Sequence, residues 1–343
     1  MSERHVLRFG PDDREPMLAA LEVVNAVRAA DAPWERPELA SHYEAELRHG
    51  WDGEPATPSL LRVDGVPVGV GSVSLTERDN RHLAWLSVAV LPEHRRRGHG
   101  RVLMEHLLHQ AGAAGRTSVG IDGWESDSSK AFAAAFGLTK ASQAIQRRQH
   151  LAEVDPALLQ KLYDEAAAAA DGYELVRVVG RTPPELLAGL VEVTAAINDA
   201  PTDDLDIEDD VMSEERLTAY EDAVLARRNR IYRLVARHEV TGQLGGHTVV
   251  AVEEERPASA HQHDTAVARA HRGHRLGLLL KAGMLVWLAE AEPQVETVDT
   301  WNAESNDHMI AVNELLGYRV MGRELQFQGS LSAALSSPGP ASS

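Results

Sequence analysis

Residues 90–103 read VLPEHRRRGHGRVL, and this stretch decides how the surrounding chain folds. The β-branched residues up to Val90 predict a strand, and the apolar residues from Val102 onward predict a long helix. The turn between them contains Gly98 and Gly100, which let the backbone bend sharply and approach a ligand closely. Its N–H groups and the positive end of the helix dipole would converge on one point, where the arginines add charge. This pattern predicts a pyrophosphate-binding turn; the alternative is a solvated turn.

A second copy of this pattern lies at residues 267–278, which read VARAHRGHRLGL. When the valines that begin the two stretches are aligned, Arg272 matches Arg95 at a spacing of 177 residues. Gly277 matches the second glycine of the first copy, whereas Arg275 replaces the first glycine. Two copies in the same context are much less likely to arise by chance than one, so the repeat points to a duplication.

The elements around the two turns recur in the same order, which extends the duplication to the whole chain. Each half is predicted to contain a first strand (5–9 and 173–179), a helix (16–30 and 184–198), a hairpin (60–75 and 231–252), a strand (84–90 and 264–267), a long helix (102–111 and 276–289) and a further strand (118–121 and 297–300). We therefore predict an α+β protein with an N-terminal domain at 1–170, a C-terminal domain at 171–332 and a disordered tail at 333–343.

Composition excludes several classes of function. The 343 residues include 34 Lys and Arg against 52 Asp and Glu, a formal net charge of −18, which argues against nucleic acid and anionic membranes as partners. The chain has no cysteine, so disulfides, thiolate nucleophiles and cysteine-bound metals are excluded, and we expect no metal cofactor. The N-terminus lacks a signal-peptide pattern and the longest apolar stretch is too short to cross a bilayer, so we expect a cytoplasmic protein.

The spacing of Arg95, Gly98 and Gly100 resembles motif A of the GNAT N-acetyltransferase superfamily, whose signature is Gln/Arg-x-x-Gly-x-Gly/Ala. The resemblance covers about residues 4–330. The chain has the layout of tandem-GNAT proteins of actinobacterial type, and it is distantly similar to those of the mycothiol synthase type. The second half is similar to one actinobacterial subgroup in further segments, among them 198–201 and 300–306. The resemblance implies two GNAT-like domains, each with a mixed, mostly antiparallel central sheet flanked by helices, and acetyl-CoA as the acyl donor.

The resemblance also implies which residues bind acetyl-CoA. In the family, the turn binds the pyrophosphate, the fourth strand pairs with the pantetheine arm, and an asparagine after the fifth strand commonly contacts that arm. The corresponding residues are Val90, Arg95, Arg96, Arg97, Gly98, His99, Gly100 and Arg101 in the first half, and Val267, Arg272, Gly273, His274, Arg275, Leu276, Gly277 and Asn306 in the second. The alternative role for Asn306 is a helix N-cap.

Acetyl transfer to an amine needs a positioned thioester, a donor for the developing oxyanion and an acceptor for the proton of the ammonium. The donor in the family is a backbone N–H at a bulge in the fourth strand, and the usual acid is a tyrosine four residues before a glycine corner. Here these tyrosine positions are Ala133 and Asn313, which cannot act as general acids. Either another tyrosine substitutes, the thiolate leaves unassisted, or one half is not catalytic.

The candidate bases lie in the second half, because the fourth strand of the first half carries no titratable group. They are His261, His263 and Asp264, and a histidine suits proton abstraction near neutral pH. Strand alternation would place His261, His263 and Val267 on one face unless a bulge intervenes. The alternative is that the histidines are exposed residues at a strand end and that Asp264 is structural. We therefore expect the second half to be catalytic and the first to be structural or to bind CoA without turnover.

The acidic run at residues 203–210, DDLDIEDD, has two interpretations. It could attract a cationic acceptor, or it could be the solvated start of a helix, where carboxylates are favoured. The leading functional hypothesis is an enzyme, an acetyl-CoA-dependent N-acetyltransferase that acts on a primary amine of a small molecule by direct attack in a ternary complex. A non-catalytic acyl-CoA sensor or scaffold of degenerate GNAT domains is the main alternative, and a protein-lysine acetyltransferase is a third.

Overall fold

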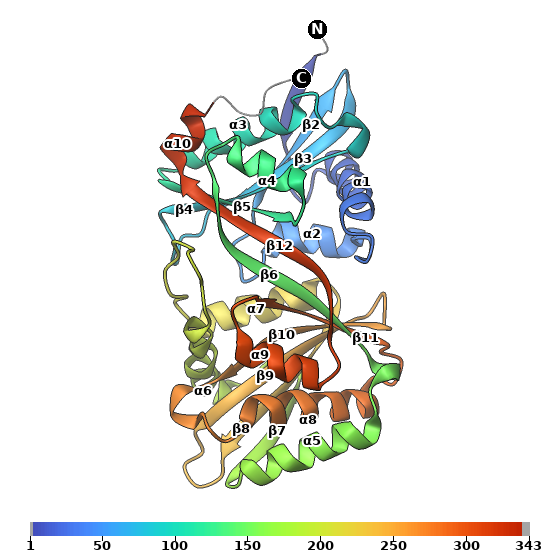
Figure 1. Ribbon diagram of the computed structural model, residues 1–343, viewed down its shortest axis with the longest axis vertical. Helices are drawn as coiled ribbons and strands as arrows, with labels where there is room; N and C mark the ends of the chain where they lie inside the picture. The colour runs from blue at the N-terminus through green and yellow to red at the C-terminus, as the bar shows by residue number, and fades with distance from the viewer. Residues whose placement is uncertain (1–2, 338–343) are drawn as a thin grey trace. The chain divides into compact units, whose positions relative to one another are not determined.

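The computed structural model describes residues 3–337, which fold into two compact units, each built on its own part of a β-sheet (Figure 1). Unit 1 comprises the described residues up to Ala144, Thr202–Glu208, and the described residues from Gly322 onward. Unit 2 comprises Ile145–Pro201 and Asp209–Met321. The polypeptide therefore passes between the two units more than once, rather than finishing one unit before it starts the other.

The elements follow the predicted order in both halves of the chain. The first half contains β1 (Arg4–Arg8), α1 (Arg14–Asp31), α2 (Ala40–His49), β2 (Thr57–Val63), β3 (Val66–Ser74), β4 (Leu83–Val90), α3 (His99–Ala113), β5 (Ser118–Trp124), α4 (Asp127–Ala134), β6 (Thr139–His150) and α5 (Pro156–Ala169). The second half contains β7 (Tyr173–Val179), α6 (Pro184–Thr194), α7 (Glu214–Ala226), β8 (Asn229–His238), β9 (Leu244–Glu253), β10 (Ser259–Val267), α8 (Leu276–Ala291), β11 (Thr297–Ala303), α9 (Asp307–Leu315), β12 (Arg319–Ser330) and α10 (Leu331–Ser336).

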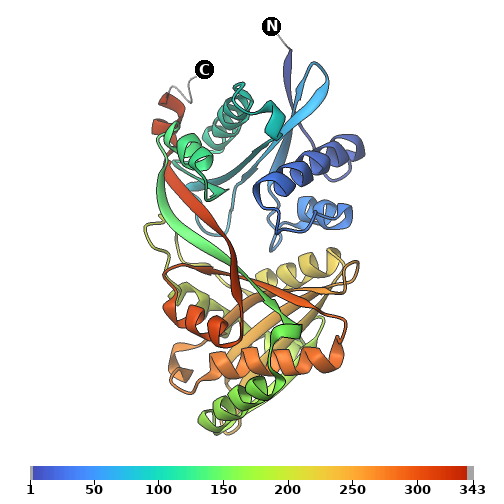
Figure 2. The ribbon, with the colours of Figure 1, turned by 45° about the vertical axis from the view of Figure 1, so that its right-hand side comes forward.

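In unit 1 the strands lie in the order β1-β2-β3-β4-β5-β12, and the pairs are antiparallel except for β4 with β5. Helices α1 and α2 cover one face, and α3 and α4 cover the other (Figure 2). Strand alternation explains this layering, because the buried Leu60 packs in the cluster with α1 while its neighbour Leu61 packs with α3. Unit 1 therefore has a core on each side of its sheet.

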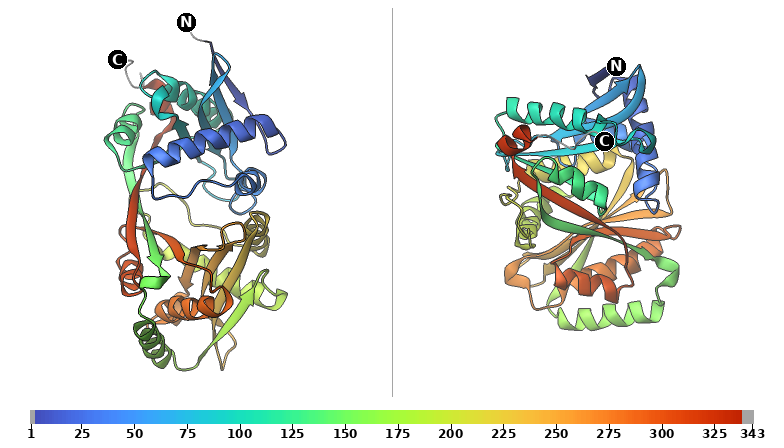
Figure 3. Two further views of the ribbon diagram at one scale, coloured as in Figure 1. Left: turned by 90° about the vertical axis from the view of Figure 1, so that its right-hand side faces the viewer. Right: turned by 45° about the horizontal axis from the view of Figure 1, so that its top comes forward.

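In unit 2 the strands lie in the order β6-β11-β10-β9-β8-β7, with β10 and β11 parallel. The neighbouring strands from β10 to β7 pair in antiparallel fashion. Helices α5 and α8 lie side by side on one face, and α6 and α7 pack on the other (Figure 3). Both units thus have a mixed, mostly antiparallel sheet flanked by helices, and the predicted fold class is confirmed.

The last strand of each half is exchanged, so the compact units do not follow the predicted boundaries at 1–170 and 171–332. β12 comes from the end of the chain, yet it pairs with β5 of unit 1 in the register Glu324↔Trp124 to Ser330↔Ser118. In return, Ile145–His150 of β6 and the whole of α5 belong to unit 2. A repeat in sequence cannot reveal this exchange, because β6 and β12 occupy equivalent places in the two copies.

The predicted disordered tail, 333–343, also begins too early. Helix α10 extends to Ser336, the Ser330 hydroxyl accepts a hydrogen bond from the Ala333 N–H at 3.3 Å, and Leu331 and Ala334 are buried. Residues 338–343 lie outside the described residues. Within residues 3–337, no helix is both long and apolar enough to cross a membrane.

The strand exchange predicts where a core mutation in β12 will act. Leu325 is buried among residues of unit 1, so Leu325→Ala should lower the free energy of unfolding by about 2–5 kcal/mol. Hydrogen exchange should then show lost protection in α3 and β5 first. Val298→Ala in β11 is the matched control, because it creates a cavity in the core of unit 2. If Leu325→Ala instead loosened α8 and β11 first, the assignment of β12 to unit 1 would be contradicted.

Candidate functional site

A cavity of about 540 Å³ opens in unit 1 where β4 and β5 separate. The two strands pair in parallel only from Leu83↔Ser118 to Leu86↔Ile121, and the following residues of β4 border the cavity. The wall is formed by the end of β4, the glycine turn, the end of β5, the start of α4 and two residues of β12. The lining includes Val88, Ala89, Val90, Arg95, Arg96, Gly98, His99, Gly100, Arg101, Asp122, Trp124, Ser126, Phe132, Glu324 and Phe327. Most of the residues predicted to bind acetyl-CoA in the first half therefore line one cavity.

The turn in unit 1 is held by its first arginine. Arg95 donates two hydrogen bonds to the carboxylate of Asp31, at 2.8 and 2.7 Å, and a third from Nε to the carbonyl of Val90 at 3.0 Å. Such a bidentate pair fixes the turn between the end of α1 and the end of β4. Arg95 therefore shapes the turn, and the side chains of Arg96 and Arg97 are exposed.

The glycines of this turn have different functions in the backbone. Gly98 is the residue before α3 and has φ of 80°, a conformation that glycine adopts without strain. Gly100 lies in the first turn of α3, where an added Cβ would come within 3.1 Å of the Phe132 ring. The first N–H groups of a helix have no partner within the helix, so this end of α3 offers donors to an anion.

The turn in unit 2 has the same construction. Arg272 donates to Asp199 at 2.6 Å and to the carbonyl of Val267 at 3.2 Å, as Arg95 does in unit 1. Each turn also has two residues with positive φ at equivalent places, and one of the two is glycine. These are Arg96 (61°) and Gly98 (80°) in unit 1, and Gly273 (90°) and Arg275 (53°) in unit 2. The glycine has therefore moved by two positions, and the replacement at Arg275 preserves the path of the backbone.

The other predicted ligands have more varied surroundings. His99 is buried, and burial, followed by the charge of Arg4, lowers its pKa. Leu276 is buried in the core of unit 2, whereas His274 is exposed with its ring 5.4 Å from that of Tyr173. The Asn306 side chain accepts a hydrogen bond from the Met309 N–H at 3.2 Å, which is the N-cap contact of α9.

The predicted bases of unit 2 lie around a bulge in β10. The register with β9 shifts by one residue between Gln262 and Thr265, so His263 and Asp264 lie in the bulge and the alternation of faces is broken. His261 and His263 therefore do not share a face with Val267, which packs against the cluster containing α8. In unit 1, β3 and β4 pair without such a shift.

Each predicted base has a partner or a shifted pKa. His263 Nδ1 lies 2.5 Å from the Tyr220 hydroxyl, and burial lowers the pKa of His263 to about 3. Burial also raises the pKa of Asp264. His261 Nε2 lies 2.6 Å from a carboxylate oxygen of Glu253. Burial opposes the ionisation of Glu253, but the contacts with His261 and Arg256 outweigh it and lower the pKa of Glu253 to about 2. His263 is thus neutral across the physiological range and a weak base.

Four carboxylate residues line the unit 1 cavity, and two of them that the sequence analysis missed have raised pKa values. Asp122 lies on β5, Glu324 lies on the exchanged strand β12, and both side chains are half-buried. Burial raises the pKa of Glu324 to about 8, and the charges of Asp122 and Glu35 add to the shift. Burial likewise raises the pKa of Asp122, although a hydrogen bond from Trp85 Nε1 at 2.5 Å opposes the shift. No sequence signal placed Glu324 in this cavity, because that required the strand exchange.

The usual tyrosine of the family is replaced in both units by a side chain that cannot donate a proton. Ala133 and Asn313 are both buried, at 1% and 0% exposure. Asn313 Nδ2 donates to Asn302 Oδ1 at 2.6 Å, so this side chain is engaged within unit 2. Across residues 3–337, no group of three or more His, Asp or Glu side chains is arranged to hold a metal ion.

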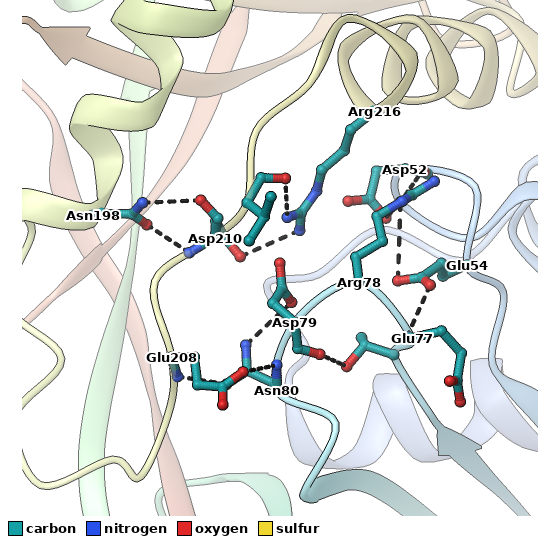
Figure 4. A network of polar contacts seen from close by, with 12 residues as sticks. Asp52, Glu54, Glu77, Arg78, Asp79, Asn80, Asn198, Glu208, Asp210 and Arg216 are labelled. Atoms are coloured by element: carbon teal, nitrogen blue, oxygen red, sulfur yellow. Dashed lines mark hydrogen bonds and ion pairs between the residues drawn. The ribbon is translucent and has the colours of Figure 1, made fainter.

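Two residues of the acidic run form hydrogen bonds with asparagines of the same unit. Glu208 and Asn80 exchange two hydrogen bonds of 2.7 Å between backbone N–H and side chain, and Asn198 and Asp210 form a similar reciprocal pair (Figure 4). Helix α7 begins only at Glu214, so the interpretation of this run as a helix start is wrong. The chain is thus held there by the Glu208 carboxylate and by the backbone of Asp210, which bonds to the Asn198 side chain.

The comparisons with known proteins agree with this geometry. Residues 23–137 match the model of the acetyltransferase (GNAT) family. Among curated proteins, a mycothiol acetyltransferase of Gordonia bronchialis is 34% identical over 101 residues, which are 28% of this chain and 32% of that protein. The match thus spans only about a third of that relative's length.

Among solved structures, a tandem GNAT protein from the clavulanic acid biosynthesis pathway is 28% identical, with a TM-score of 0.80 over 99% of this chain and 100% of that one. A GCN5-related N-acetyltransferase from Sphaerobacter thermophilus shares the fold at 16% identity, with a TM-score of 0.65 over 99% and 98% of the two chains. Residues 23–137 are therefore similar to the acetyltransferase (GNAT) family, and the described residues 3–337 have the fold of a tandem GNAT protein.

Proposed function

We propose that this protein is an acyltransferase that moves the acetyl group of acetyl-CoA to a primary amine of a small molecule, by direct attack in a ternary complex. The observation that supports it is the unit 1 cavity, which has the glycine turn at its wall and the unpaired edge of β4 along its side. The N–H groups at the start of α3, with Arg96 and Arg97, would hold the pyrophosphate. The edge of β4 around Val90 would pair with the pantetheine arm.

The carboxylates of the same cavity supply a base that β4 lacks. A general base works best when its pKa lies near the working pH, and that of Glu324 is about 8. Glu324 would take a proton from the acceptor ammonium, with Asp122 beside it. This cavity leads us to propose unit 1 as the site of turnover, although the sequence alone favoured the second half.

Unit 2 keeps features that a second site would need. Its turn has the same backbone as that of unit 1, and its bulge at His263 and Asp264 is where the family takes its oxyanion donor. His261, His263 and Asp264 stay predictions for catalysis in this unit. The low pKa of His263 makes it a poorer proton acceptor than Glu324.

The second candidate function is a non-catalytic acyl-CoA sensor, and the buried Ala133 and Asn313 favour it. Calorimetry with acetyl-CoA would show binding in both cases. Release of free thiol from acetyl-CoA with a panel of primary amines would occur only for the enzyme. Acetyl-CoA binding without thiol release above the hydrolysis background would decide for the sensor.

A matched pair of glycine substitutions tests which unit turns over. Gly100→Asp places a carboxylate beside the proposed pyrophosphate site and crowds Phe132, so it should weaken acetyl-CoA binding by about tenfold or more and abolish turnover. Gly277→Asp is the equivalent change in unit 2, where an added Cβ meets nothing within 4 Å. We expect this second variant to keep most of the turnover, measured by thiol release. The reverse result would assign catalysis to unit 2.

The pKa of Glu324 also predicts a pH-dependent stability. Because this pKa is about 8 in the folded protein and 4.5 in an ordinary glutamate, the folded state holds the proton more tightly than the unfolded chain. The contribution of Glu324 to the free energy of unfolding is therefore present below about pH 4.5 and is lost as the pH rises through about 8. Glu324→Gln should be more stable, relative to the wild type, at about pH 9 than at about pH 5 in urea unfolding.

Glu44→Gln is the control, since Glu44 lies on α2 and pairs with Arg48 on the surface of the same unit. Its stability relative to the wild type should not follow this pH dependence. An identical difference at both pH values for Glu324→Gln would show that Glu324 ionises normally in the folded protein.

A further inference from the structure

One face of the unit 1 sheet gathers tryptophan and carboxylate side chains. Trp124 and Glu324 are opposite each other in the β5–β12 ladder, as are Asp122 and Gln326. Because side chains alternate, all four lie on the same face, while Ile121, Leu325 and Phe327 lie in the core on the other. The face is thus polar and aromatic where two strands about 200 residues apart in the sequence meet, and it borders the cavity.

Two further tryptophans extend this face. The ring of Trp85 lies over Gly120, where a Cβ would approach it to 2.3 Å, and its Nε1 donates to Asp122 at 2.5 Å. Trp34 meets Trp124 edge to face, with ring centroids 5.2 Å apart. A Cβ on Gly322 would come within 2.3 Å of Trp34, so the absence of a side chain there lets the indole approach β12. The face therefore holds three of the six tryptophans of the chain.

The titratable groups on this face are carboxyls, and Glu324 becomes negative as the pH rises through its pKa of about 8. Burial is the main cause of this raised pKa, and the charges of Asp122 and Glu35 add to it. One oxygen of Asp122, Oδ1, is buried and has no hydrogen-bond partner among the described residues. A buried carboxylate oxygen without a donor costs free energy, which a bound cationic donor would offset.

We propose that this Trp–carboxylate face, made of Trp34, Trp85, Trp124, Asp122 and Glu324, selects the acceptor as a cation: a protonated primary amine carried on a flat apolar body. The inference rests on the proposed function and names the acceptor class for it. The ammonium lies between Asp122 and Glu324, and the apolar body lies against Trp124, the tryptophan of this face that lines the cavity. Trp34 packs edge to face on Trp124, and Trp85 donates a hydrogen bond to Asp122. Glu324 is therefore a specificity-determining residue as well as a base.

Acetyl transfer needs no group beyond Glu324, the amine and the thioester. Glu324 takes one proton from the ammonium, and the amine nitrogen then forms a bond to the acetyl carbonyl carbon. The bond between that carbon and sulfur breaks, and the electron pair leaves with the sulfur of CoA. The second amine proton is lost as the amide forms, and one proton returns to the thiolate. The products are an N-acetyl amide, CoA with a free thiol and one proton.

The experiment compares two probes of one shape in the full-length protein without acetyl-CoA. Binding is measured at about pH 9, where Glu324 is ionised and phenethylamine is still mainly a cation, whereas 2-phenylethanol has the same ring and chain but no charge. Quenching of tryptophan fluorescence measures the binding of each. We expect phenethylamine to bind about tenfold more tightly than 2-phenylethanol, and added salt to weaken only the amine. Equal binding of the two probes by the wild type would overturn the proposal without any variant.

Substitutions separate the contribution of the carboxylates to probe binding from that of the tryptophan contact. Glu324→Gln and, independently, Asp122→Asn should reduce the preference for the cation to about threefold or less. Trp124→Leu should weaken both probes, and Glu44→Gln should change neither. An unchanged preference in folded Glu324→Gln and Asp122→Asn, as checked by thermal unfolding, would refute the roles of these carboxylates.

Failure of this inference can be told apart from failure of the proposed function. Acetyl-CoA binding by calorimetry, and its loss in Gly100→Asp, report only on the donor site. Suppose that the protein binds acetyl-CoA and releases thiol as readily with a neutral aromatic amine such as aniline as with phenethylamine. The proposed function would then be supported, and the inference about a cationic acceptor would be refuted. If the protein prefers the cation but releases no thiol, the cation site would be supported and the proposed acetyl transfer would be refuted.

Discussion

The antiparallel ladder between β5 and β12 is the interaction on which unit 1 depends. It runs from Trp124↔Glu324 to Ser118↔Ser330 and joins residues about 200 positions apart. β4 can cover only the first part of the other edge of β5, because the two strands separate after Leu86. Without β12, β5 would therefore keep an open edge, and the core residues Leu325 and Phe327 would be missing from under α3. The same separation of β4 from β5 opens the cavity.

The two turns show how a duplicated site can vary in sequence while its backbone is kept. In both turns an arginine joins an aspartate at the end of the preceding helical segment to the last carbonyl of a strand. Each also needs two left-handed residues, and a non-glycine residue there costs about 1–2 kcal/mol. Because each turn has one glycine and one arginine at these two places, the strain is similar in both. A motif that requires glycine at one fixed position would overlook the second copy.

Much of the fold could be predicted from the sequence, because period and repeat are local properties. The strand-turn-helix units around Arg95 and Arg272 and the order of the elements follow from such patterns, whereas the seam predicted near Asp171 lies inside unit 2. The exchange of β6 and β12 could not be predicted, since either strand satisfies the same hydrophobic pattern in either sheet. For the same reason Glu324 was not predicted as a site residue, whereas His263 was predicted as a base only because it is a histidine. Its burial and its contact with Tyr220 depend on packing that no local pattern encodes.

The exchanged strand has a consequence for how the protein is made. During translation the ribosome finishes β5 long before it reaches β12, and at about 5–20 residues per second the interval is on the order of 10–40 s. Through that time the nascent chain carries an unpaired strand with Val119 and Ile121 at its edge, which is a template for association with other chains. Unit 1 can therefore complete its sheet only after the second half of the chain has been made. If the chain were divided between its two repeats, each product would have to close its sheet with its own last strand, β6 or β12, in place of the exchanged one.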